Sequence, residues 1–491
     1  MNISSLNRPR PFVLPALLLV LALVMGFYNL GGYLMNDDEG TYLYDAWRVS
    51  LGDVPYRDFF VAQTPLGLGF VAVLFKIFGP TVWGARALSF LFILGTACLI
   101  YLASRKFFKF NKELSLLAAG LFLFTKHIYF LGRMFMPDGA MLFLSTAGLY
   151  FALKAEQAAP QKGRWPTFLF GAFAGLAALA KLNAVLLPAG YALFLLFLLV
   201  KKAEKPGALL RKAFFPALGF LLTFGLFYGL MLIFIPGAYQ ATLGFHLAKE
   251  KAAISGLVLL PFTRLVQFAG NHNYGLIPVA VTGMFLAPLF KDRKRTLLFF
   301  VTLAALAQVF LPGTFYPRYI IFALVPLTLF FGDGVIGIGA RAKVKSFVFP
   351  VAAVLILLCL GPTFSLKKLR AYDRDTRTLA AVVRNNTAAG DYVFGDDPGI
   401  NFLARRPCPP RLVDVSGAMT RSGQITAADI YADCERHEVK FILVEKGQSA
   451  HHLKNLRDYP RFQSYLDRAY ELVGTMPRNF LQVDVYRRRN E

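Results

Sequence analysis

Long apolar runs fill most of the first 365 residues of this chain, and they constrain its fold more than any other feature. A helix that crosses a bilayer needs about 20 consecutive, mostly apolar residues, and lipid offers its backbone no hydrogen-bond partners. Eleven such runs lie near residues 12–30, 86–104, 114–130, 138–153, 167–180, 183–200, 213–235, 274–290, 296–311, 319–338 and 346–362. The predicted fold class is an α-helical polytopic membrane protein with about eleven transmembrane helices.

Composition supports this class. Of the 491 residues, 56% are apolar and 17% are charged, whereas about a quarter of the residues in soluble domains are charged. The net charge is +24, but the basic residues cluster between apolar runs, so we expect no nucleic-acid partner. Four cysteines in so long a chain exclude a disulfide scaffold.

The basic residues also predict the topology, because Lys and Arg are retained in cytoplasmic loops. If the 14-residue run Pro65–Phe78 does not cross, 21 of the 32 basic residues before Leu366 fall on one side. They are Arg8, Arg10, Arg105, Lys106, Lys109, Lys112, Lys154, Lys162, Arg164, Lys201, Lys202, Lys205, Arg211, Lys212, Lys291, Arg293, Lys294, Arg295, Arg341, Lys343 and Lys345. We therefore expect Pro65–Phe78 to be a juxtamembrane helix in a cell inner (cytoplasmic) membrane protein. We expect the first helix to be retained rather than cleaved, with the N-terminus in the cytoplasm. The C-terminal domain would then be extracytoplasmic.

An acidic loop, about residues 31–64, follows the first run on the outer side. It holds six of the 13 carboxylates before Leu366, namely Asp37, Asp38, Glu39, Asp45, Asp53 and Asp58. Arg133, Lys181 and Arg318 stand near the ends of spans, where a charge is costly unless it pairs or binds. Arginine suits phosphate, and a carboxylate nearby could take a proton from an acceptor hydroxyl. These residues favour a cleft that binds a lipid phosphate beside a general base.

Several motifs carry a resemblance to a known family. They are Asn36–Tyr42 (NDDEGTY), Ala46–Arg48 (AWR), Gly52–Phe60 (GDVPYRDFF), Gln63–Gly67 (QTPLG), Gly132–Arg133 with Pro137–Asp138, Lys181 after an Ala-rich run, and Pro317–Tyr319 (PRY). In order and spacing they resemble the GT-C membrane glycosyltransferases. The branch is the bacterial one related to protein O-mannosyltransferases and the lipid A aminoarabinose transferase. The resemblance covers roughly residues 12–340.

The resemblance implies inverting transfer of a sugar from a polyprenyl-phosphate donor to a glycan, lipid or protein acceptor outside the membrane. It assigns Asp38 and Glu39 to catalysis, with Asp38 as general base or acceptor-orienting group, and Asp37 leaves a one-residue shift open. Substrate contacts are expected from Tyr42, Arg57, Asp58, Gln63, Arg133, Asp138, Lys181, His246, Arg318 and Tyr319. Many relatives have Lys-Pro-Pro or His-Pro-Pro where this chain has Gln63–Pro65, so one candidate cation for the donor phosphate is missing.

Other interpretations stay open. No cofactor is expected, because a lipid phosphate is already a good leaving group; a divalent metal on Asp37, Asp38 and Glu39 is the alternative. Arg133 and Asp138 could pair with each other, and Lys181 could reach the membrane interface from a helix end. The chain could instead be a transporter or flippase of polyprenyl-linked glycans, which would more often show inverted repeats. A glycan ligase or polymerase would be expected to carry a large outer loop between late spans.

Residues 366–491 contain no run that could cross a bilayer and predict a small α/β domain that covers the active site or guides the acceptor. Helices are expected over 376–385, 427–437 and 459–469, and strands over 392–394, 411–415, 440–445, 470–476 and 481–487. Gly395–Gly399 follows a strand, but it lacks GxGxxG and carries two Asp, which argues against nucleotide binding. Cys408 and Cys434 could pair in an oxidising compartment.

Overall fold

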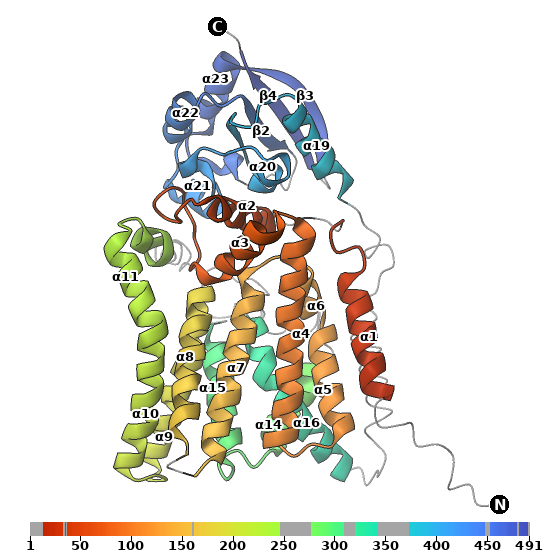
Figure 1. Cartoon of the computed structure of the whole chain (residues 1–491), viewed down its shortest axis with the longest axis vertical. Coiled ribbons are helices and arrows are strands. Elements are labelled where there is room, and N and C mark those ends of the chain that lie inside the picture. Colours follow the sequence, from red (N-terminus) through yellow and green to blue (C-terminus); the bar gives the residue numbers. More distant parts are fainter. Residues whose placement is uncertain are drawn as a thin grey trace, which may run out of the picture.

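The computed structural model describes residues 13–32, 35, 37–159, 162–245, 276–308, 320–341, 373–446, 452–478 and 481–489. Within these ranges a helical bundle lies along the long axis of the molecule, and a small sheet with its own helices covers one end of the bundle (Figure 1). The predicted span at 346–362 lies outside the described residues.

The bundle is built from helices that follow the apolar runs closely. They are α1 (Val13–Phe27), α4 (Val82–Phe107), α5 (Lys112–Phe124), α6 (Lys126–Gly132), α7 (Pro137–Gln157), α8 (Arg164–Ala180), α9 (Leu186–Val200), α10 (Pro206–Phe220), α11 (Leu226–Phe234), α14 (Leu276–Leu286), α15 (Arg293–Ala307) and α16 (Ile321–Arg341). Four helical segments in the described residues are long and apolar enough to cross a membrane, or five if a bent pair is one span. The chain is a multi-pass membrane protein, while the expected total of eleven spans stays a prediction.

One predicted run is not a single straight helix. The run at 114–130 is divided at Thr125 into α5 and α6, whose axes differ by 67°. The backbone of Thr125 leaves the helical region at φ −57° and ψ 127°, and its hydroxyl donates to the carbonyl oxygen of Leu121 at 2.7 Å. This bend turns the chain at the end of the bundle that carries the sheet (Figure 1).

Two short helices form a layer between the bundle and the C-terminal sheet (Figure 1). They are α2 (Asp37–Leu51) and α3 (Leu66–Phe78). With 13 residues, α3 is shorter than a bilayer span requires, as expected for the run at 65–78. Helix α2 was not predicted, because its acidic first turn was interpreted as part of a loop.

The C-terminal sheet has the strand order β1-β2-β4-β3. Its strands are β1 (Val393–Gly395), β2 (Phe441–Lys446), β3 (Tyr470–Arg478) and β4 (Leu481–Arg488), with β1 parallel to β2 and the other pairs antiparallel. Around it lie α19 (Arg374–Asn385), α20 (Pro398–Ala404), α21 (Gly417–Ser422), α22 (Ala427–Arg436) and α23 (Tyr459–Ala469). The strand predicted at 411–415 is wrong. The Leu412 N–H donates to the Pro409 carbonyl oxygen at 2.9 Å, and the backbone of Val413 is helical, so a 3₁₀ turn forms at Pro410–Leu412 instead.

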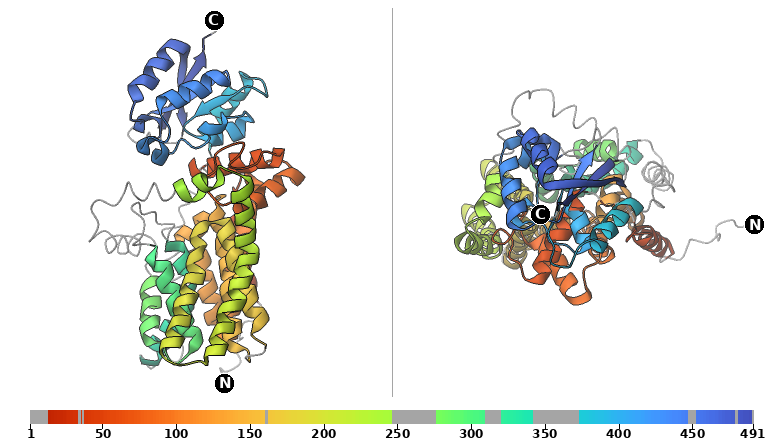
Figure 2. Two further views of the ribbon diagram at one scale, coloured as in Figure 1. Left: turned by 90° about the vertical axis from the view of Figure 1, so that its left-hand side faces the viewer. Right: turned by 90° about the horizontal axis from the view of Figure 1, so that it is seen from above.

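The basic helix ends gather at the opposite end of the bundle, away from the sheet (Figures 1 and 2). Ion pairs join Lys212 to Glu156 at 2.9 Å and Arg293 to Glu204 at 2.8 Å. These pairs tie the end of α7, the α9–α10 loop and the start of α15 into one basic surface. Among the described residues, these basic clusters therefore lie together at one end of the bundle, while the side of the membrane that they face stays a prediction.

Candidate functional site

The first turn of α2 carries three consecutive carboxylates, Asp37, Asp38 and Glu39, at a helix end that favours negative charge. Their surroundings differ sharply. Glu39 is fully buried, Asp37 is partly exposed and turns toward the C-terminal sheet, and Asp38 is exposed. Of the three, Asp38 is therefore the carboxylate most accessible to a substrate.

Glu39 is held by a buried ion pair. The Arg86 guanidinium donates from Nε and Nη2 to the two carboxylate oxygens of Glu39, at 2.7 Å each, and both side chains are fully buried. The same arginine donates to the carbonyl oxygen of Leu30, and the Phe135 backbone N–H donates to Glu39 at 2.7 Å. Glu39 thus fixes α2 against α4, the end of α1 and the segment before α7. Arg86 itself went unrecognised in the sequence, although it was a charge at the start of an apolar run.

A second buried ion pair lies nearby. Pro137 opens α7 and places Asp138 in its first turn, where both carboxylate oxygens accept from Lys181 Nζ at 2.8 and 2.7 Å. Lys181 follows the last residue of α8 and is 8% exposed, so it does not reach outward to the membrane interface. A Cβ added at Gly67 of α3 would lie 2.9 Å from Pro137 Cβ, so α3 packs directly onto this pair's helix.

Arg133 contacts the end of α1. Its guanidinium donates to the carbonyl oxygens of Met25 at 2.5 Å and Tyr28 at 2.8 Å, and it lies 5.5 Å from the Tyr129 ring. These carbonyls end α1, where a cation is favoured by the unpaired backbone oxygens. In this structure Arg133 anchors α1 to the segment that leads to α7.

These groups share one end of the bundle. The Phe135 N–H that binds Glu39 lies two residues before Pro137, and the Phe135 ring packs edge-on against Tyr42 at 6.5 Å. The exposed Asp38 and the Asp138–Lys181 pair are therefore brought to the same end, beneath the C-terminal sheet. Asp38, Arg133 and Lys181 lie at this same end of the bundle. That they line one cavity together with Arg318 stays a prediction, since Arg318 lies outside the described residues.

The remaining predicted residues of the acidic loop form a surface turn. Asp58 accepts from Arg57 and from the Val54 N–H, and these hydrogen bonds lower the pKa of Asp58 to about 2. The Gln63 carbonyl accepts from the Tyr56 hydroxyl at 2.5 Å. His246, Arg318 and Tyr319 lie outside the described residues, so their assignment to substrate stays a prediction.

The C-terminal unit reaches the site through Arg478, at the end of β3. Arg478 is 2% exposed and pairs with Asp37 of α2 at 2.6 Å, with Asp397 at 2.5 Å and with Glu445. Asp397 also caps α20 by accepting from the Gly399 N–H. One arginine therefore joins the sheet, α20 and the first turn of α2. No sequence pattern points to this contact, since Arg478 is 441 positions from Asp37.

Two buried carboxyls of the C-terminal unit indicate that the stability of the folded protein depends on pH. Burial raises the pKa of Asp396 and of Asp397 to about 6, and the negative charge of Asp37 contributes to both rises. The positive charge of Arg478 lowers both pKa values, and His452 also lowers the pKa of Asp396. The folded protein then holds these protons more tightly than the unfolded chain, so stability falls as pH rises from about 4 to about 6. We expect the melting temperature in detergent to fall over this range. The lowered pKa of Asp58 affects the stability only below this pH range.

Asp397→Asn provides the test, because Asn keeps the helix cap but does not titrate. The variant's melting temperature should depend less steeply on pH between 4.5 and 6.5. Identical slopes for variant and wild type would show that Asp397 does not carry the effect.

A second carboxyl on α2 also faces the C-terminal unit. Asp45 is 1% exposed, and among the described residues its Oδ1 has no hydrogen-bond partner. Burial, then the nearby Asp414, raises the pKa of Asp45 well above its ordinary value. Burial likewise raises the pKa of Asp414, and the charge of Asp38 adds to that effect. Asp414 therefore belongs to the surroundings of Asp38, which the C-terminal unit helps to form.

Close backbone contact holds α20 against α2. A Cβ added at Gly40 would lie 2.4 Å from Asp397 Oδ1 and 2.9 Å from Gly399 Cα. We expect Gly40→Ala to destabilise the protein by about 1–3 kcal/mol through this overlap, although Ala favours a helix. The melting temperature measures the loss. Gly69→Ala on α3 is the control, because nothing lies within 4 Å of its added Cβ; an equal response at both sites would contradict the overlap.

The three carboxylates of α2 do not point to a shared position. Asp37 faces Arg478 and Glu39 faces Arg86. Within the described ranges, no group of three or more His, Cys, Asp or Glu side chains could hold a metal ion. That transfer needs no cofactor stays a prediction. Cys408 and Cys434 are both buried and both free thiols in this structure.

Known proteins share this fold. The sequence model of a family described as dolichyl-phosphate-mannose-protein mannosyltransferase matches residues 62–228. The structure of ArnT from Cupriavidus metallidurans bound to undecaprenyl phosphate is similar with a TM-score of 0.72 and 15% identity, covering 97% of this chain and 98% of that one. The structure of the apo oligosaccharyltransferase of Archaeoglobus fulgidus is similar with a TM-score of 0.62 and 13% identity, and the match covers 96% of this chain and 74% of that one. Comparison with curated protein sequences gives no match.

At this level of identity the structures establish the fold. It is the fold of the GT-C glycosyltransferases related to protein O-mannosyltransferases and ArnT, and the resemblance predicted from the sequence is confirmed. The similarity to ArnT spans nearly the whole of both chains and so includes the C-terminal part as well as the bundle.

Proposed function

We propose that the protein transfers a sugar from a polyprenyl-phosphate donor to an acceptor hydroxyl or amine at the outer face of the cytoplasmic membrane. The observation that carries the proposal is the exposed Asp38, held by buried ion pairs at one end of a GT-C fold. Support comes from the matched ArnT structure, which contains undecaprenyl phosphate. The candidate acceptors are a glycan, a lipid and a protein, and the shape of the pocket rather than any motif would select among them.

The chemistry is a single displacement. Asp38 takes or orients the acceptor proton while the acceptor oxygen or nitrogen attacks the anomeric carbon, and the bond to the lipid phosphate breaks with inversion. The phosphate leaves with growing negative charge, which Lys181, and Arg318 outside the described residues, would stabilise. Glu39 acts through position: its pairing with Arg86 holds the first turn of α2 in place. Tyr42, Arg57, Asp58 and Gln63 would border the substrate from the acidic loop.

The test uses the purified full chain with a panel of synthetic polyprenyl-phosphate sugars, both hexoses and pentoses. Release of polyprenyl phosphate is measured with and without candidate acceptors, with and without a chelator of divalent metals. We expect release from at least one donor, dependent on an acceptor and insensitive to the chelator. A folded protein that releases no lipid phosphate from any donor would contradict the proposal.

A further inference from the structure

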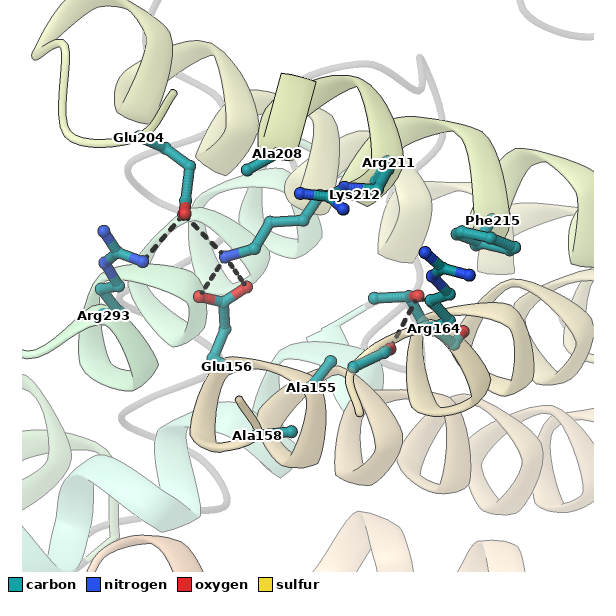
Figure 3. A pocket seen from close by; sticks show the side chains of 12 residues that line it. Ala155, Glu156, Ala158, Arg164, Glu204, Ala208, Arg211, Lys212, Phe215 and Arg293 are labelled. Carbon is teal, nitrogen blue, oxygen red and sulfur yellow. Dashed lines mark hydrogen bonds and ion pairs between the residues drawn. The ribbon is translucent and has the colours of Figure 1, made fainter. Parts of the chain in front are cut away.

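A second polar site lies at the end of the bundle opposite Asp38. A cavity of about 170 Å³ opens between the last turn of α7, the first turns of α8 and α10, and the start of α15 (Figure 3). Four cations line it, Arg164, Arg211, Lys212 and Arg293, together with the two carboxylates Glu156 and Glu204. Nothing in the proposed transfer reaction uses these side chains.

The two carboxylates are already balanced. Lys212 Nζ lies 2.9 Å from Glu156 and 3.0 Å from Glu204, and Arg293 lies 2.8 Å from Glu204. The Glu156 side chain has no exposed surface, so this network is built into the wall of the cavity (Figure 3). Two acidic and two basic groups therefore cancel one another, and the charge of the site comes from the other two cations.

Arg164 and Arg211 provide an uncompensated charge of two. Within the described part of the chain neither forms an ion pair; the Arg164 guanidinium lies over the Phe215 ring at 6.0 Å, and both arginines are exposed. The cavity also receives the first turns of α8 and α10, at which no side-chain cap is present in the part of the chain that the structure describes. Positive helix ends and two arginine forks together favour an anion with several oxygens, such as phosphate.

Exposed apolar side chains lie on the same helices as the two arginines. Trp165 follows Arg164 and is 72% exposed, Leu210 precedes Arg211 and is 70% exposed, and Phe214, one helical turn after Leu210, is 56% exposed. Such side chains on a membrane protein face lipid, and Trp is enriched at the level of the headgroups. The cavity is also preformed, because α8 and α10 touch closely beyond it: a Cβ added at Gly171 would lie 1.9 Å from the Pro216 carbonyl oxygen.

We propose that this cavity binds the phosphate headgroup of an anionic phospholipid between Arg164 and Arg211, with the acyl chains along Trp165, Leu210 and Phe214. Basic pockets between transmembrane helices bind anionic headgroups in this way. A free phosphate ion would satisfy the arginines equally well, but it would leave the adjoining apolar surface unused. The site is independent of the donor site at the other end of the bundle.

Native mass spectrometry of the full chain in detergent tests the proposal. Phosphatidylglycerol is titrated against phosphatidylcholine, and the variant Arg164→Gln/Arg211→Gln is compared with wild type. The matched control is Lys201→Gln/Lys202→Gln, which removes two exposed cations at the same end that do not line the cavity. We expect wild type and control to prefer phosphatidylglycerol, and the arginine variant to bind it about tenfold more weakly. The single variant Arg211→Gln, at an exposed side chain, replaces the double variant if the latter does not fold.

Three results would overturn the proposal. Equal binding of phosphatidylglycerol by wild type and the arginine variant would show that the cavity does not hold the lipid. Displacement of the lipid by millimolar inorganic phosphate would assign the site to a free anion. Loss of binding in the Lys201/Lys202 control to the same extent would reduce the effect to surface charge. Sugar transfer, measured in parallel, does not enter these outcomes.

Discussion

Asp38→Asn is expected to lower the rate of sugar transfer by about 10²- to 10⁴-fold, the usual contribution of a general base. Asn keeps the size and polarity of the side chain but accepts no proton at neutral pH. Because Asp38 is exposed at the helix end, the loss of its charge should leave the fold intact. The measurement is release of polyprenyl phosphate by the purified variant, together with its melting temperature.

Two neighbours make this result specific. Asp53→Asn is the matched control, since Asp53 lies in the same loop and pairs with Arg48 at the surface; it should stay within about twofold of wild-type rate. Asp37→Asn tests the alternative that the catalytic carboxylate is Asp37 and not Asp38. In the structure Asp37 is paired with Arg478. If Asp37→Asn abolishes transfer while Asp38→Asn does not, the catalytic carboxylate is Asp37 and the assignment made here is wrong.

The sequence predicted a cluster of functional carboxylates at Asp37, Asp38 and Glu39 but could not separate their surroundings. Three acidic residues in a row have the same local chemistry, and only their partners distinguish them. Glu39 is paired with a residue 47 positions away and Asp37 with one 441 positions away. No period or motif encodes such contacts, because they depend on how α4 and the C-terminal sheet pack onto α2. Asp138 and Lys181 were both expected at the site, yet their pairing likewise required the packing of α7 against α8.

The helices, too, could be predicted from the sequence only in part. Apolar runs predicted the bundle helices well, since each lipid-facing or core helix must be apolar over most of its length. Helix α2 was missed because its polar first turn resembles a loop, and its buried side, including Leu43, Tyr44 and Trp47, is covered by other elements only in the fold. The strand expected at 411–415 is wrong for a local reason, since Leu412 closes a 3₁₀ turn on the Pro409 carbonyl oxygen.

The buried pair Arg86–Glu39 carries the second large prediction, this time for stability. Arg86→Met should destabilise the protein by about 3–5 kcal/mol, because it leaves the Glu39 carboxylate buried without its two charge-assisted bonds. The melting temperature in detergent measures the loss. Sugar transfer should fall with it, since the first turn of α2 that carries Asp38 is fixed through Glu39. Arg411→Met, which breaks the exposed pair with Asp429, should change stability by less than about 1 kcal/mol.

A double substitution separates burial of a charge from general damage to the core. Glu39→Leu/Arg86→Met removes both charges together and leaves no unpaired ion, so it should be more stable than Arg86→Met alone. A double variant that is more stable than Arg86→Met would show that the single variant is destabilised by its uncompensated carboxylate. If the double variant is at least as unstable as the single one, the arginine stabilises this end of the bundle chiefly through its bond to the Leu30 carbonyl and its packing. In either case transfer by the double variant reports whether Asp38 needs this anchor, because the reacting carboxylate itself is unchanged.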